Sequence, residues 1–97
     1  MGAHFGADIR RPLKKESVIM SGASAELLPA DASRQFVLVC SAKGNGAAAF
    51  DPTGGICALD AGVPMDGGDS IPVEGKAAES AMTQIGTAGQ KLTVYWG

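Results

Sequence analysis

The longest run of apolar, β-forming residues in this chain is Phe36–Cys40, which directly follows a turn that contains Pro29. An unbroken apolar run of this length predicts a strand at the centre of a sheet, covered on both faces. Near the end of the chain, Lys91–Trp96 alternates instead, with Leu92, Val94 and Trp96 on one face. Such alternation is typical of a strand with one face in the core. The two segments predict the main strands of the fold.

Other short apolar segments predict further strands, each ended by Gly, Pro, Asn or Asp. They are Ser17–Met20, Ala25–Leu28, Ala47–Phe50, Ile56–Leu59 and Ser70–Val73. Pro72 cannot donate a ladder hydrogen bond, so it assigns its segment to a sheet edge. Residues 60–69 are rich in Gly, Pro and Asp and are expected to form a loop.

Two local signals concern the connections. Asn45-Gly46 suits the positive φ angles of a tight turn and predicts a hairpin between the flanking strands 37–41 and 47–50. Residues 77–85 fit helical spacing and composition. The segment is short and lies between Gly75 and Gly86, so we favour a strand there and keep a helix as the alternative.

These elements predict an all-β fold, a small antiparallel β-sandwich or barrel of six to eight short strands. With 97 residues, the chain is expected to build one core. Residues 1–15 show neither helical nor strand periodicity, so we expect an extended N-terminal arm, followed by a single β domain over residues 16–97.

Charge divides the chain in the same place. Residues 1–16 carry four basic and two acidic side chains, whereas residues 17–97 carry four basic and eight acidic ones. The basic side chains of the arm are Arg10, Arg11, Lys14 and Lys15. They are either a solvated cluster or a contact with an acidic or carbonyl-rich partner. Too few basic residues lie elsewhere to form a nucleic-acid-binding face.

The N-terminus lacks the apolar region of a signal peptide, and no run is long enough to cross a membrane. We therefore expect a chain that is made in the cytosol and does not bind a membrane. Cys40 and Cys57 lie in apolar, strand-like runs without C-x-x-C spacing. Reduced core residues are the favoured interpretation, and a disulfide formed late or a reactive or metal-bound thiol remains open.

Residues that carry catalytic or metal chemistry are sparse. His4 is the single histidine and lies in the arm, so no Ser-His-Asp or Cys-His site is expected. Asp60, Asp66 and Asp69 lack calcium-loop spacing, which favours a solvated turn over a bound cation. The sequence thus predicts no catalytic, cofactor or metal site and no enzyme activity.

Tyr95 and Trp96 are the sole tyrosine and tryptophan of the chain. Trp96 either caps the core or, with Tyr95, supplies area at a subunit contact, where such residues are enriched. Both interpretations stay open at the level of sequence.

The order of elements from Val18 to Gly97 resembles a family of small structural proteins of tailed bacteriophages. The shared features are a Leu-Leu-Pro-Ala turn, an Arg before an apolar strand, a Gly-rich loop and a closing strand of Leu-Thr-Val type. In this chain they are Leu27–Ala30, Ser33-Arg34, Phe36–Val39, Gly67–Ile71 and Lys91–Val94.

This resemblance implies a virion component, made in the host cytoplasm, and favours a capsid decoration (cement) protein that binds the outside of the shell and stabilises capsomer junctions. Its partner would be the major capsid protein, and a homo-oligomer, with a trimer favoured, would multiply weak contacts. The alternative is a tail or head-fibre adaptor that serves as an attachment module of the particle.

Overall fold

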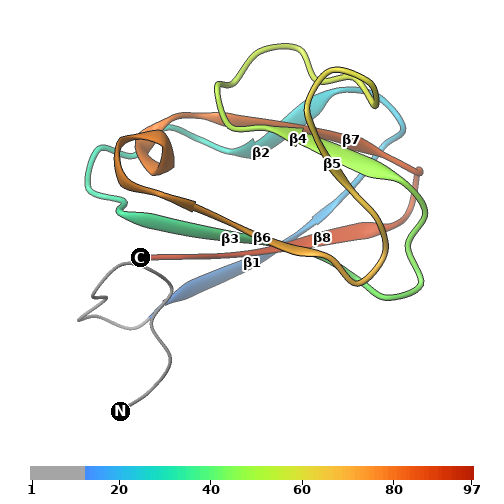
Figure 1. Ribbon diagram of the computed structural model, residues 1–97, viewed down its shortest axis with the longest axis horizontal. Coiled ribbons are helices and arrows are strands. Elements are labelled where there is room, and N and C mark those ends of the chain that lie inside the picture. The colour runs from blue at the N-terminus through green and yellow to red at the C-terminus, as the bar shows by residue number, and fades with distance from the viewer. Residues whose placement is uncertain (1–12) are drawn as a thin grey trace.

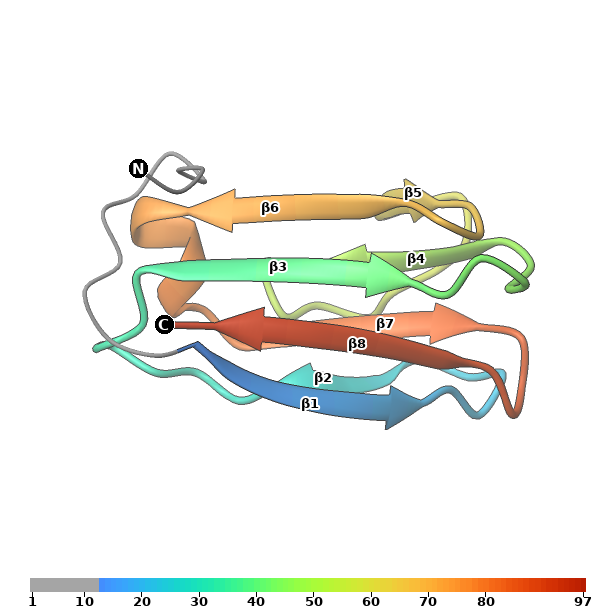
Figure 2. The same ribbon diagram turned by 90° about the horizontal axis from the view of Figure 1, so that it is seen from below.

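The computed structural model describes residues 13–97, which form two four-stranded antiparallel sheets packed face to face (Figures 1 and 2). Sheet A has the order β1-β8-β3-β6, with β1 Lys14–Ile19, β8 Lys91–Trp96, β3 Phe36–Ser41 and β6 Ser70–Glu74. Sheet B has the order β2-β7-β4-β5, with β2 Ala25–Leu28, β7 Met82–Gly86, β4 Ala48–Asp51 and β5 Val63–Met65. A short 3-10 helix, η1, covers Gly75–Glu79. The all-β sandwich prediction is confirmed.

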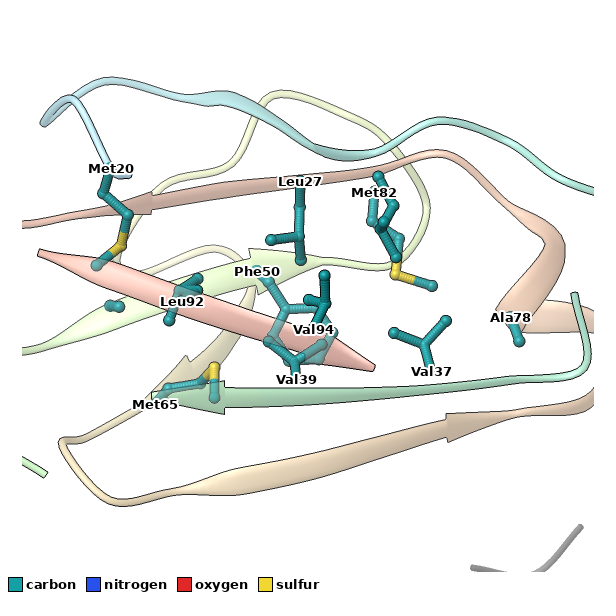
Figure 3. Packing of buried hydrophobic residues seen from close by; sticks show 12 residues of the cluster. Met20, Leu27, Val37, Val39, Phe50, Met65, Ala78, Met82, Leu92 and Val94 are labelled. Atoms are coloured by element: carbon teal, nitrogen blue, oxygen red, sulfur yellow. The ribbon is translucent and has the colours of Figure 1, made fainter. Parts of the chain in front are cut away.

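The core fills the space between the sheets (Figure 3). On β3 the pleat alternates as expected of a two-faced strand: Val37 and Val39 are fully buried, whereas Leu38 and Cys40 are half-buried on the outer face. Sheet A contributes further inner residues from β8, and sheet B contributes residues from β2, β4 and β7. These are Leu92 and Val94 on one side and Leu27, Leu28, Phe50 and Met82 on the other.

Three strands of sheet A, β3, β6 and β8, confirm the predicted segments. β3 is central, bonded to β8 on one side and to β6 on the other. β6 is an edge strand, as Pro72 required. β8 pairs with β1 over six residue pairs, and β1 begins at Lys14, earlier than the expected Ser17.

The predicted hairpin around Asn45-Gly46 is wrong, because β3 and β4 lie in different sheets. Among residues 13–97 positive φ angles occur at glycines alone, and Gly46 is not one of them. Asn45 instead anchors the crossing loop to β8, where its Nδ2 donates to the Lys91 carbonyl oxygen at 2.7 Å. The Gly46 N–H donates to Oε1 of Gln90 at 2.9 Å. These distant contacts replace the hairpin turn.

The expected strand over Ile56–Leu59 is also wrong, since that segment holds one isolated bridge, Ala58 to Ala61. The expected loop over residues 60–69 contains strand β5 instead. Its three residues extend sheet B by pairing antiparallel with β4.

The ambiguous segment 77–85 divides between both interpretations. Its first residues belong to η1, and the rest form β7, which is central in sheet B. Ala78 in η1 is fully buried and closes one end of the core.

Candidate functional surface

A long loop, residues 52–62, lies over the outer face of sheet B, yellow-green at the top of Figure 1. It carries two large apolar side chains that project into solvent: Ile56 is 89% exposed and Leu59 is 54% exposed. Single exposed apolar residues are common on protein surfaces. Two on one loop mark a candidate contact surface, which we call the 52–62 loop surface.

The first part of the loop is held by hydrogen bonds. The Asp51 carboxylate accepts from the N–H of Thr53 at 2.8 Å and from its hydroxyl at 2.6 Å. These two bonds lower the pKa of Asp51. Thr83 on β7 donates from its hydroxyl to the Gly55 carbonyl at 2.5 Å. Gly54 has a φ of 81°, which a residue with a side chain rarely adopts. The loop is therefore fixed to β4 and β7.

The second part is held by a buried thiol. Cys57 is 2% exposed, and its N–H donates to the hydroxyl of Ser24 at 2.9 Å. Gly62 packs so closely that an added Cβ would lie 3.2 Å from the Cys57 sulfur and 3.4 Å from Cβ of Ala49. Burial raises the pKa of the Cys57 thiol. Cys57 thus serves as an anchor on the outer side of sheet B.

The two cysteines are free and lie on opposite outer sides of the sandwich. Cys40 faces outward from sheet A, paired with Thr93 and Ser70, whereas Cys57 lies outside sheet B. Packed sheets are about 10 Å apart, and a disulfide requires Cα atoms within roughly 7 Å. The structure therefore rules out the late intramolecular disulfide.

The two aromatic candidates point to different sides of sheet A. Trp96 packs, half-buried, against the core from the inner face, as in the core-capping interpretation. Tyr95 faces outward on the same strand, and Nζ of Lys15 lies 5.7 Å from its ring centroid, within the range of a cation–π contact. The outer face of sheet A therefore brings together Lys15 and Tyr95, which the sequence analysis had treated separately.

Of the four basic residues of the arm, the structure describes two. Lys14 and Lys15 are exposed residues of β1. Arg10, Arg11 and His4 lie outside the described residues.

The aspartates of the Gly-rich loop form a turn. Oδ2 of Asp69 accepts from the Asp66 N–H at 2.8 Å, and the Asp69 N–H donates to the Asp66 carbonyl at 3.0 Å. Within residues 13–97, no three side chains of His, Cys, Asp or Glu gather in a metal-binding group. The same part of the chain holds no helix of the length and apolarity needed to cross a membrane.

Two features escaped the sequence analysis. The 52–62 loop surface was hidden because the Ile56–Leu59 run was interpreted as a strand. Arg34 was noted for its family resemblance alone, yet it is 3% exposed and donates to three backbone carbonyls, those of Pro29, Ala78 and Ser80. The turn that contains Pro29, followed by a single Arg, is the local signal in the sequence that points to it.

Comparison with solved structures finds the same fold in a phage protein. The crystal structure of the stem and receptor binding domain of the spike protein P1 from bacteriophage PM2 matches 90% of this chain with a TM-score of 0.62 and 16% sequence identity. The chain spans about a third (33%) of that spike chain. No family model matches the sequence, and no curated protein matches it significantly. The likeness shows a shared β-sandwich architecture.

Proposed function

We propose that this chain is a structural module of a phage particle, and that it serves in attachment. Two independent lines support this proposal. The sequence resembles small structural proteins of tailed phages, and the fold is similar to part of a phage spike that contains a receptor binding domain. The second line favours the attachment role over the capsid decoration role. The proposal assigns the chain no catalytic activity and places it in the virion.

The observation that carries the proposal is the 52–62 loop surface. Burying one exposed Leu or Ile side chain contributes roughly 1.5–3 kcal/mol. The loop is already ordered by the bonds of Asp51, Thr83 and Cys57, so binding would lose little conformational entropy. Ile56 and Leu59 would then act as the apolar anchors of a contact with a receptor on the host cell surface.

Each such contact is small, so several copies per particle would be needed for firm attachment. Linked copies raise the effective concentration of the second and later contacts. A homo-oligomer, for which the sequence analysis favoured a trimer, fits this requirement.

The capsid decoration role remains the alternative. In that role the basic residues Arg10, Arg11, Lys14 and Lys15 would contact the major capsid protein, and the acidic body would face solvent. Both roles place the chain on the outside of the particle, and they differ in the surface to which it binds.

A cell-binding assay separates the two. The fluorescently labelled full chain is mixed with host cells and, separately, with purified capsid shells that lack it. We expect saturable binding to cells that the double variant Ile56→Ser/Leu59→Ser loses. Leu13→Ser, an exposed apolar residue outside the loop, is the control and should bind like the wild type.

Binding to capsid shells but not to cells, with the loop variant binding as well as the wild type, would replace attachment by decoration. Binding to neither would overturn both roles. Circular dichroism of each variant confirms that the fold is intact.

A further inference from the structure

The sandwich has four edge strands, and three of them are protected against pairing with another chain. β5 has three residues and contains Pro64, and β6 contains Pro72. β2 has four residues and an irregular register between Glu26 and Leu28. Prolines, short strands and bulges are the usual protection of sheet edges. β1 has none of these: it has six residues in unbroken register with β8.

The direction of the backbone groups of β1 follows from its hydrogen bonds. The N–H of Met20 donates to the carbonyl of Gln90 at 2.8 Å, in the register that β1 and β8 share. Hydrogen-bonded pairs alternate along an antiparallel ladder. Even-numbered residues of β1 therefore bond to β8, and Lys15, Ser17 and Ile19 direct their N–H and C=O groups outward.

The other strand pairs of sheet A give the same alternation. Phe36 and Gly97 exchange two hydrogen bonds, at 3.0 and 3.1 Å. Odd-numbered residues of β8 therefore bond to β3, and even-numbered residues of β8 bond to β1. The Ser41 N–H donates to Asp69, so even residues of β6 face outward and Pro72 removes the N–H that the edge would offer. Among residues 13–97, one edge of sheet A is blocked at its centre, and the other is open.

The lysine on the outer face of β1 does not protect that edge. Lys15 is the one charged residue on the outer face of β1, and its Nζ lies over the Tyr95 ring of the neighbouring β8 strand. Its charge is thus drawn back onto its own sheet. At the other end of the strand, Ile19 is 63% exposed. Within residues 13–97 no strand pairs with this side of β1.

We propose that β1 pairs antiparallel with β1 of a second copy of this chain, around a two-fold axis at Ser17. This register opposes Lys15 to Ile19 of the second copy and Ser17 to its own counterpart. All three outward residues then form hydrogen-bonded pairs, for about six interchain bonds. The aliphatic stem of Lys15 covers the exposed Ile19 of the second copy.

The charges of β1 specify this register. On the inner face it opposes Glu16 to Val18 and Lys14 to Met20, so no like charges stand directly opposite. A slip by one residue joins inner to outer faces and breaks the shared core side. A slip by two residues in one direction opposes Glu16 to Glu16, and in the other direction it leaves Lys15 without a strand partner.

The contact is one strand wide, well below the size of standard interfaces. The dimer is therefore weak and concentration-dependent in solution, and gains strength where copies are held close together. This inference goes beyond the proposed function and does not depend on it. Its test needs neither cells nor particles.

Sedimentation velocity of the full chain at increasing concentration is the first test. We expect a monomer that converts to a dimer, and we expect Ser17→Pro, which removes the central outward N–H, to remain monomeric. Ser70→Pro is the matched control, because it removes an outward N–H at the blocked edge β6 and should dimerise like the wild type.

A second test does not depend on proline substitutions. In the proposed register the two Ser17 Cα atoms are about 5.5 Å apart, within disulfide range. Mild oxidation should therefore link Ser17→Cys into a covalent dimer, whereas the wild type, with its free Cys40 and Cys57, should not link. A wild type that stays monomeric, a Ser17→Pro variant that still dimerises, or a Ser17→Cys variant without the covalent dimer would each overturn the proposal.

Discussion

Replacing Arg34 by Met tests how two connections at one end of the sandwich are held together. The buried guanidinium donates to the Pro29 carbonyl after β2 and to the Ala78 and Ser80 carbonyls around η1. It therefore ties the β2–β3 turn to the connection that leads into β7. Met keeps most of the apolar stem and removes all three donors.

The magnitude follows from the groups left behind. A buried carbonyl without a donor costs about 1–3 kcal/mol, and water reaches some of the part-buried ones. Against this loss stands the desolvation of the cation, which lowers the pKa of Arg34 and is relieved in the variant. We expect a net loss of about 3 kcal/mol. In a domain of this size that corresponds to a fall in melting temperature of roughly 12–24 °C.

Urea unfolding followed by circular dichroism at 25 °C measures this loss. Arg34→Lys keeps the charge but cannot reach three carbonyls at once, and it should lose an intermediate amount. Lys76→Met, at a side chain that is 93% exposed, is the control and should unfold like the wild type. If Arg34→Met lies within about 0.5 kcal/mol of the wild type, the proposed clamp has no energetic role.

Three further predictions follow from turns and thiols. An added Cβ at Gly67 would lie 2.5 and 2.6 Å from two backbone carbonyl oxygens, so Gly67→Ala should lose about 2–4 kcal/mol in urea unfolding, while Gly44→Ala, with open space around it, should be neutral. Ellman's reagent should modify half-buried Cys40 well before buried Cys57, and equal rates would contradict the packing of the 52–62 loop. The lowered pKa of Asp51 means that its hydrogen bonds stabilise the fold above an unfolded-state pKa near 3.9 and are lost as the pH falls through the folded value. The urea midpoint should therefore fall more steeply below about pH 4 in the wild type than in Asp51→Asn.

Local pattern was sufficient for three of the four strands of sheet A. β3 follows from its unbroken apolar run, β8 from its alternation, and the edge position of β6 from Pro72. Each of these signals lies within the strand itself. Binary patterning and backbone chemistry were therefore enough to predict these three strands without any tertiary contact.

In sheet B the predicted strands Ala25–Leu28 and Ala47–Phe50 are confirmed as β2 and, shifted by one residue, β4, whereas the connection into β4 and strand β5 depend on contacts distant in sequence. The partners of Asn45 and Gly46 are Lys91 and Gln90, more than forty positions away, and they override a strong hairpin signal. β5 has three residues, too few to show a pattern in the sequence. Its position is set by antiparallel pairing with β4.

The candidate surfaces divide in the same way. Ile56 and Leu59 are exposed because hydrogen bonds with β4, β7 and the β1–β2 connection hold the loop in place. These partners are distant in sequence, and the local apolar run alone resembles a strand. The open edge of β1 becomes visible when the register of all four edge strands is known.

The central claim is that this chain is an attachment module on the outside of a phage particle. Immunogold electron microscopy of purified particles from the phage that encodes it, with antibodies raised against the full chain, tests this most directly. The account predicts label confined to the few projecting structures of the particle. Label spread evenly over the whole shell would indicate decoration, and particles without label would contradict the account.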